Sequence, residues 1–375
     1  MTSPATAYVR TADAPLLPPP RGTVGAIGWL RQNLFSSIGN SLLTVAISLF
    51  LGLIAWTILD WAVIRAVWTG VDRESCVVPG AGACWPFVWT KFPQWLFGFY
   101  PFEERWRPVL AFLIGGAALI PMMIPAVGGK RWNGLFLIFI YPVIAFILLR
   151  GGLGLPPVPT TDWGGLLVTI AVAVTGIAVS LPLGVLLALG RRSRLPVVRL
   201  SSVIFIETWR GVPLVTVLFM ASVMLPLFLA PGSSVDKLLR AVVGISLFAA
   251  AYVAEAVRGG LQAVGRGQHE GAAALGLKPW QATAKIVLPQ ALRISIPNLV
   301  GIFIGLFKDT TLVLVVGIYD FLGIIGAGTQ DARWAGPQTA NTGYFTAAIV
   351  YFVFCFAMSR YAAFTERRLG AARRA

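Results

Sequence analysis

The stretch Glu270-Gly271-Ala272-Ala273-Ala274-Leu275-Gly276 is followed ten residues later by Ile286-Val287-Leu288-Pro289, and both lie between two long apolar segments. The small side chains of the first stretch predict a short helix, and Gly276 suits the left-handed residue that ends one. Pro279 suits the first turn of a second helix, which Pro289 would close. Two short helices that meet at an angle form a compact knob. Because Ala and Gly have little bulk, such a knob can sit close in a cleft of another protein.

The two flanking apolar segments belong to a set that runs through the chain. Hydrophobic residues make up 57% of the 375 residues and charged residues only 12%, against about 25% charged in soluble domains. A helix needs about 20 mostly apolar residues to cross a bilayer. Eight such runs start near Ser41, Val109, Asn133, Gly164, Val212, Leu238, Ile296 and Gly343. The sequence therefore predicts an all-α polytopic membrane protein with about eight transmembrane helices and both termini on one side.

The basic residues indicate which side that is. The net charge of +15 is sorted by loop rather than gathered on one soluble face, as Arg191 to Arg199 and Lys278 to Arg293 illustrate. Lys and Arg concentrate in loops that stay in the cytoplasm. We therefore expect the N-terminus, the C-terminus and the 270–289 stretch in the cytoplasm. The sorting by loop also argues against a nucleic-acid partner.

The 270–289 stretch resembles the EAA loop of bacterial ABC importer permeases. That loop reads Glu-Ala-Ala, three residues, Gly, nine residues, Ile, one residue, Leu-Pro, and only Gly271 departs from it, which affects packing detail. For the first seven residues alone, an Ala-rich interfacial helix is the alternative. In the family the loop docks on a cytoplasmic ATPase. The resemblance therefore implies an ATPase-coupling loop made of Glu270, Gly271, Ala272, Gly276, Ile286, Leu288 and Pro289.

The resemblance covers only the second part of the chain. It implies a five-helix type I ABC-importer core at residues 163–370, with the cytoplasmic coupling loop at 263–292. Residues 34–162 would hold three accessory transmembrane helices and an aromatic-rich periplasmic loop at 69–107. The first 33 residues lack the apolar region and cleavage site of a signal peptide, and we expect a flexible cytoplasmic tail there.

Three further stretches of sequence indicate which branch of the family the chain resembles. Glu207 to Leu214, Ala251 to Leu261 and Lys308 to Leu312 resemble runs typical of the polar amino-acid (His/Glu/Gln/Arg/opine) branch of these permeases. With the three extra helices, the chain is most similar to the M-type permease subunits of general L-amino-acid uptake systems. The resemblance implies a subunit of the bacterial cell inner membrane that translocates polar or general L-amino acids by alternating access.

Charged side chains inside these crossings require an explanation, because they cost free energy unless they are paired or face water. Glu207 with Arg210, and Glu255 with Arg258, stand three residues apart and share a helix face, which predicts two local ion pairs. Alternatively these residues border the transport path. A zwitterionic amino acid needs a cavity with separated opposite charges. The candidate path or gate residues are therefore Glu207, Arg210, Glu255, Arg258, Lys308, Asp309, Thr310 and Thr311.

Two pairs of small or hydroxylated residues have simpler explanations than a role in the transport path. Gly259 and Gly260 allow helices to approach closely or break at the membrane edge, and packing is the favoured role. Thr310 and Thr311 could instead bond to their own helix.

No Gly-x-x-x-x-Gly-Lys-Ser/Thr phosphate loop occurs in the sequence, so we expect no enzyme, no catalytic residue and no cofactor in this chain. ATP and Mg²⁺ would act on a separate dimeric ATPase. Five core helices enclose no closed path, so a second permease subunit is expected, a related but non-identical chain. The family implies a periplasmic solute-binding protein as a further partner.

The cysteines and the single histidine bear on disulfides and metals. Cys76 and Cys84 lie in the predicted periplasmic loop, where an oxidising compartment permits a disulfide; two free thiols are the alternative. Cys355 is expected to pack inside the last crossing. His269 has no close Cys/His cluster, so we predict no metal site.

Two other classes of function compete with this interpretation. A secondary transporter could couple uptake to protons or sodium through Glu255, Arg258, Lys308 and Asp309, but the sequence shows no inverted repeat. A non-transporting membrane scaffold is the third class. Uptake that an uncoupler stops at constant ATP would favour the secondary transporter, whereas purification without an ATPase and without flux would favour the scaffold.

Overall fold

The computed structural model describes residues 25–124, 126–228 and 235–371. The chain divides into two compact units, Met1–Ala66 and Val67–Ala375. The predicted flexible tail, residues 1–33, lies mostly outside the described residues. Its last part forms helix α1, Gly25–Asn33, and is therefore helical.

Among the described residues of the first unit, 25–66, one helix is long enough to span a membrane. Helix α2, Ile38–Leu59, begins at Ser37, whose hydroxyl accepts a bond from the Asn40 N–H. It continues through the π-turn Asp60–Ile64 to give a 27-residue span with mean hydropathy 2.4. No residue of α2 is buried in the described part of the chain. A helix that is apolar on all sides suits a lipid environment.

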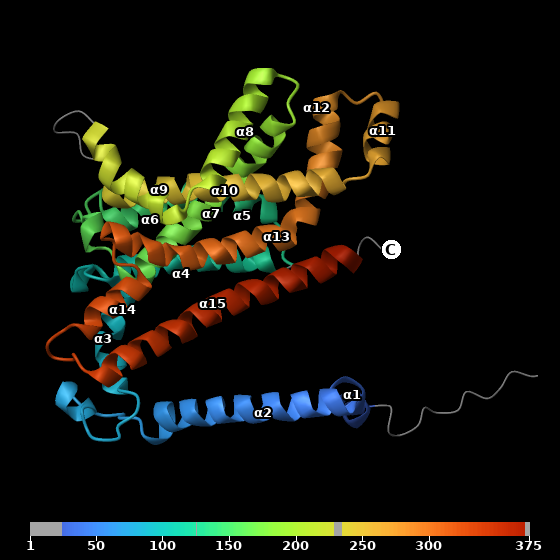
Figure 1. Ribbon diagram of the computed structural model, residues 1–375. Coiled ribbons are helices and arrows are strands. Elements are labelled where there is room, and N and C mark those ends of the chain that lie inside the picture. Colours follow the sequence, from blue (N-terminus) through green and yellow to red (C-terminus); the bar gives the residue numbers. More distant parts are fainter. Residues whose placement is uncertain (1–24, 125, 229–234, 372–375) are drawn as a thin grey trace, which may run out of the picture. The chain divides into compact units, whose positions relative to one another are not determined.

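The second unit is built from helices with short irregular connections (Figure 1). Its α-helices are α3 (Trp85–Phe97), α4 (Trp106–Met123), α5 (Lys130–Leu135), α6 (Tyr141–Arg150), α7 (Gly165–Arg191), α8 (Pro196–Gly211), α9 (Leu214–Phe219), α10 (Lys237–Ala263), α11 (Arg266–Ala274), α12 (Pro279–Ala282), α13 (Leu288–Asp309), α14 (Phe321–Thr329) and α15 (Pro337–Ala371). Short stretches of 3₁₀- or π-helix are η2 (Arg73–Cys76), η3 (Phe102–Glu104), η4 (Phe136–Ile140), η5 (Thr160–Asp162), η6 (Met220–Met224), η7 (Leu225–Phe228), η8 (Thr283–Val287) and η9 (Thr310–Val316).

The predicted number of crossings is confirmed. Among the described residues, seven helices are long and apolar enough to cross a membrane, and an eighth span results if one bent pair counts as a crossing. In that pair, Pro196–Gly211 and Leu214–Phe228 meet at 104°. Val212 and Pro213 at the bend have extended backbone, because proline cannot continue the hydrogen bonds of the preceding helix. The crossing expected to start near Val212 is therefore separated from α8 by this bend.

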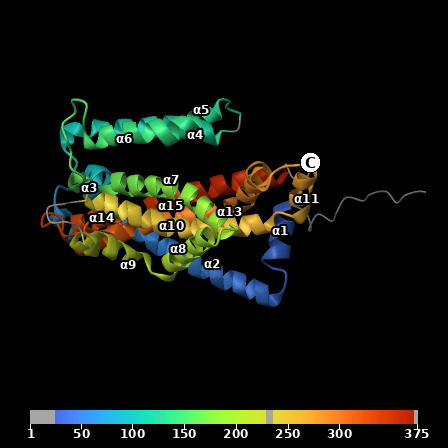
Figure 2. The same cartoon turned by 90° about the horizontal axis from the view of Figure 1, so that it is seen from above.

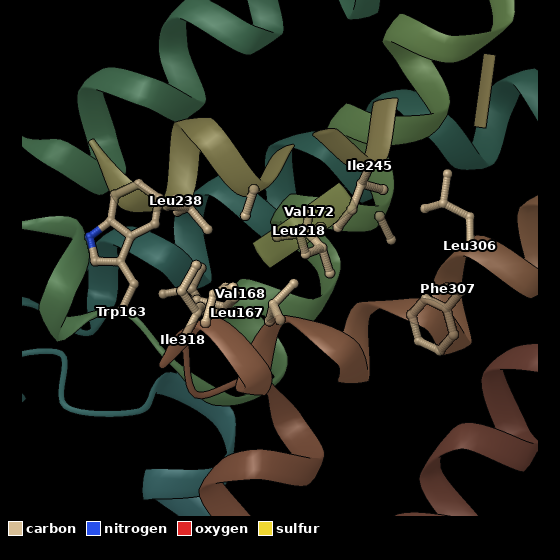
Figure 3. Close-up of a cluster of buried hydrophobic side chains, with 14 of the residues drawn as sticks. Trp163, Leu167, Val168, Val172, Leu218, Leu238, Ile245, Leu306, Phe307 and Ile318 are labelled. Carbon is tan, nitrogen blue, oxygen red and sulfur yellow. The ribbon is translucent and has the colours of Figure 1, made fainter. Parts of the chain in front are cut away.

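The largest apolar core of this unit joins α7, α9, α10 and α13. Leu167, Val168, Leu218 and Ile245 are buried in it, and Figure 3 shows these side chains converging from separate helices. Among the described helices, α7 and α10 pack against each other most extensively. A Cβ at Gly184 of α7 would collide with the Val253 side chain of α10, so glycine permits this approach.

Helices α10 and α13 form a second close pair and run side by side in both views (Figures 1 and 2). A Cβ at Gly260 would collide with Ser295 Oγ and the Ala291 carbonyl, whereas a Cβ at Gly259 has open space. The Ser295 hydroxyl also donates to the Ala256 carbonyl at 3.0 Å. Packing is thus the role of Gly260.

The hairpin of α4 and α6 packs together and is tied to the connections beside it. The Tyr100 hydroxyl donates to the Leu149 carbonyl at 2.9 Å. Arg107 is fully buried, pairs with Glu104 at 2.9 Å and donates to the Pro156 carbonyl at 2.7 Å. These residues fall in the same compact unit as α7–α15. That unit starts at Val67, and the accessory boundary at 162/163 stays a prediction.

Candidate functional site

The predicted coupling loop is a helical hairpin that connects α10 to α13. Figure 1 shows α11 and α12, in orange, beyond one end of these two long helices. Gly276 has the predicted left-handed conformation, with φ +71°. Its N–H donates to the Ala273 carbonyl at 2.9 Å, and the Leu277 N–H donates to the Ala272 carbonyl at 3.1 Å. These two bonds make a Schellman ending, which fixes the turn between the arms.

The second arm begins as predicted but does not end as predicted. Lys278 precedes Pro279, the first residue of α12, and its N–H donates to Gln281 Oε1 at 2.9 Å. The sequence predicts that Pro289 closes this helix, and that prediction is wrong. The π-turn η8 leads directly into α13, so Pro279–Val316 is a single 38-residue span. The π-turn allows the helix to continue past Pro289, because it changes the backbone hydrogen-bonding pattern at the place where proline lacks an N–H.

The residues of the loop divide into exposed and packed groups. Glu270, Gly271, Gly276 and Pro289 are exposed, Ile286 and Leu288 are half-buried, and Ala272 is buried. Sequence reasoning missed Leu275 and Trp280, which are 78% and 64% exposed. Their signal was the presence of two large apolar residues in an otherwise small and polar loop. Such exposed apolar groups are typical of contact surfaces.

Glu255 of α10 is the centre of a charge cluster that joins three helices. Its Oε1 pairs with Arg191 of α7 at 2.8 Å, and its Oε2 pairs with Arg258 at 2.8 Å. Arg210 of α8 lies 3.8 Å from the same carboxylate. The predicted Glu255–Arg258 pair is therefore present.

The prediction of a second local ion pair, between Glu207 and Arg210, is wrong. Glu207 pairs with Arg191 at 2.9 Å, and Arg210 is directed to Glu255 and lies over the Tyr252 ring at 5.6 Å. Arg191 thus bridges two carboxylates. Sequence reasoning had placed it only among the basic loop residues, because spacing along one helix carries no information about a partner on another.

A pocket lies between α9, α10 and α13. Its volume is about 300 Å³, and Leu214, Phe248, Tyr252 and Ile302 are among the residues that line it. Asp309 is the acidic residue in this lining. A mainly apolar pocket with one carboxylate can hold an organic molecule and fix a cationic group on it.

The other predicted path residues in α13 and η9 lie elsewhere. Lys308 is exposed, and it does not line the pocket. The Thr310 hydroxyl donates to the Phe307 carbonyl at 2.8 Å, and the Thr311 hydroxyl donates to the Lys308 carbonyl at 2.9 Å. Both threonines therefore bond to their own helix, which is the simpler of the two roles that the sequence allows.

The cysteine pair and the question of metals complete the survey of predicted sites. Cys76 and Cys84 form a disulfide, and Cys355 is a free, half-buried thiol. Within the described ranges, no group of three or more His, Cys, Asp or Glu residues could hold a metal ion.

Taken together, the helices, the pocket and the hairpin define a class of protein. They belong to a polytopic α-helical membrane protein in which two pocket-lining helices, α10 and α13, are joined by an exposed hairpin. The sequence of this hairpin follows the spacing of the EAA-loop pattern from Glu270 to Pro289, and only Gly271 departs from it.

Comparison with known proteins places the chain within that class. A family model described as the binding-protein-dependent transport system inner membrane component matches residues 180–371. The chain belongs to this family. It is 49% identical to the inner membrane amino-acid ABC transporter permease protein YhdY of Escherichia coli K12, over 93% of this chain and 94% of that protein.

A second relative matches over nearly its whole length, and a solved structure matches about half of this chain. The glutamate/glutamine/aspartate/asparagine transport system permease protein BztC of Rhodobacter capsulatus is 39% identical over 97% of this chain and 98% of its own length. A crystal structure of an amino acid ABC transporter with histidines is 28% identical, covers 54% of this chain and 92% of its own, and has a TM-score of 0.48.

Proposed function

We propose that this chain is the permease subunit of an ATP-driven importer that carries polar or general L-amino acids across the inner membrane by alternating access. The observation that carries the proposal is that the pocket and the hairpin share two helices. Helices α10 and α13 supply Phe248, Tyr252, Ile302 and Asp309 to the pocket, and α11, α12 and η8 connect these same two helices. A displacement of the hairpin therefore acts on two walls of the pocket at once.

The assembly follows from this role. A separate dimeric ATPase, with its ATP and Mg²⁺, docks on the hairpin from the cytoplasm, where both termini also lie. A related second permease subunit completes the path, and a periplasmic solute-binding protein delivers the amino acid. The chain itself carries no ATPase motif. The names of YhdY and BztC support amino acids as the transported class.

The pocket supports a zwitterionic substrate. In this proposal the Asp309 carboxylate, which lines the pocket, pairs with the α-ammonium group of the substrate. Tyr252 links the pocket wall to the cation of Arg210. A volume of about 300 Å³ is at the small end of ligand pockets, which suits a single amino acid.

The proposal is tested by pull-down of the detergent-solubilised chain from native membranes, with identification of its partners and their ATPase activity. The wild type should recover an ATPase that Gly276→Pro loses. Proline cannot adopt φ +71°, and it removes the N–H that bonds to Ala273. Gly267→Ala is the matched control, because its added Cβ has open space in α11.

Uptake measurements complete the test. Glu270→Lys and Gly276→Pro should abolish ATP-driven uptake while the chain still inserts into the membrane. Normal uptake in both variants contradicts the coupling role. If neither wild type nor variant recovers an ATPase, the ion-coupled transporter becomes the better explanation.

A further inference from the structure

The segment of residues 67–100, here called the α3 segment, makes contacts that the proposed function leaves unused. It lies outside the region matched by the family model, residues 180–371, yet it packs on elements within that region, α14 and α15. Phe87 and Trp95 of this segment are fully buried in one apolar cluster with Phe321, Ile324 and Trp334. The ring of Phe87 lies 5.3 Å from that of Trp95 and 5.9 Å from that of Trp334.

Polar contacts join the same two parts of the chain. Lys91 Nζ donates to Asp331 Oδ2 at 2.5 Å. The Arg73 N–H donates to the Arg333 carbonyl at 2.9 Å, and Arg333 Nε donates to the Val71 carbonyl at 3.1 Å. Residues 330–336, here called the α14–α15 loop, are therefore fixed to the α3 segment by an ion pair and by hydrogen bonds that involve backbone groups.

The α3 segment is itself internally fixed. The Cys76–Cys84 disulfide closes its first part, and the Val67 N–H donates to the Ala83 carbonyl at 2.8 Å. The Cys84 N–H donates to the Thr342 hydroxyl of α15 at 2.8 Å. A rigid segment that contacts a loop at several points restricts the motion of that loop.

The α14–α15 loop is connected to the pocket. Helix α14 follows η9, which continues directly from Asp309 at the end of α13. Asp320 begins α14, where its carboxylate accepts the N–H groups of Leu322 and Gly323 and the Tyr351 hydroxyl. Motion of α14 would therefore be transmitted to the wall that carries Asp309.

We propose that the α3 segment is a brace that holds α14 and the α14–α15 loop as one rigid body with the pocket wall, and that Lys91 and Asp331 are its positioning residues. The inference rests on the proposed import function. The brace keeps ATP hydrolysis coupled to transport, because a loose α14 lets the pocket wall move without carrying substrate.

The test uses the full chain in its assembled importer and compares Lys91→Glu, Asp331→Lys and the double charge swap. In each single variant, amide hydrogen exchange in residues 330–336 should become about fivefold faster, as expected for loss of a partly exposed ion pair. The swap should restore exchange to near the wild-type rate except at Arg333, whose N–H loses Asp331 Oδ1 as its acceptor. Glu74→Lys, an exposed charge reversal in the same segment, is the matched control and should leave exchange unchanged.

The functional readout is the number of amino acids transported per ATP hydrolysed. This ratio should fall in both single variants and recover in the swap, whereas a loss of folded complex alone lowers both rates together. Unchanged exchange in the single variants overturns the brace, and faster exchange with an unchanged ratio overturns its part in coupling. If the wild type shows no ATP-driven uptake, the proposed function fails, while the exchange measurement still decides on the brace.

Discussion

At the scale of single residues, the charges show what sequence spacing can and cannot predict. The i, i+3 rule gave the Glu255–Arg258 pair, because both residues lie on one helix. It failed for Glu207 and Arg210, whose partners, Arg191 and Glu255, lie on other helices. Pairing across helices depends on how the helices pack, and a local pattern does not contain that information.

The cluster leads to an ordered prediction of stability. Glu255→Gln should lower the free energy of unfolding by about 2 kcal/mol, because it leaves several cations close together without their carboxylate. Glu207→Gln should cost less than about 1 kcal/mol, since the Glu207 side chain is 53% exposed against 16% for Glu255. Thermal unfolding in detergent measures both. Equal losses in the two variants would contradict the central position of Glu255.

Asp309 gives a prediction for activity. Asp309→Asn keeps the size of the side chain but removes the charge in the pocket. We expect KM for amino-acid uptake to rise by about tenfold or more, because a hydrogen bond to a charged group contributes about 1.5–3 kcal/mol. Uptake kinetics in proteoliposomes would measure this, with ATPase activity as the control for assembly. An unchanged KM would remove Asp309 from the substrate contacts.

At the scale of elements, apolar length predicted the membrane helices well because the bilayer sets a minimum length for each. Two of the places where the predicted helices differ from the structure are at prolines. Pro213 separates α8 from α9 at a 104° bend, whereas Pro289 lies inside a continuous span. The outcome depends on whether the neighbouring turns can change their bonding, as η8 does. Residue type alone does not decide this.

The close approach of α10 and α13 gives a prediction with a built-in control. Gly260→Val should destabilise the protein by about 1–3 kcal/mol, because the side chain must displace Ser295 or the Ala291 carbonyl. Gly259→Val changes the adjacent residue by the same group in open space, and its effect should be limited to the change in helix propensity, which is slightly higher for valine than for glycine. Unfolding midpoints of the two variants distinguish packing from a general glycine requirement.

At the scale of the whole molecule, the chain joins a region that the family model matches, residues 180–371, to a region that this model does not cover. The sequence predicted three accessory helices at residues 34–162 but assigned them no contacts. The α3 segment and α14 are more than 200 residues apart in sequence, as Lys91 and Asp331 show with a separation of 240. Aromatic residues in the 69–107 loop favoured a membrane interface, and no local signal identified Trp334 as their partner.

This long-range pair gives a prediction about pH. The hydrogen bond from Lys91 holds the pKa of Asp331 below its usual range. A carboxyl group with a lowered pKa in the folded state stabilises the fold at pH values above its unfolded pKa, about 3.9. This contribution is lost as pH falls through the lower folded value.

Protection of residues 330–336 against hydrogen exchange, corrected for intrinsic rates, should therefore be constant from pH 8 to about 5 and decrease only below about 4. In Lys91→Gln the decrease should begin at higher pH. Protection that falls already near pH 6 would mean that another group controls this loop.

Helix α2 has a consequence for how the protein is made. It forms a 27-residue apolar span, and none of its residues is buried in the described part of the chain. The backbone groups of its interior turns are satisfied within the helix, as a lipid environment demands. Its entry into the bilayer therefore need not wait for later segments to be synthesised, so α2 can anchor the nascent chain in the membrane while the ribosome is still translating the rest.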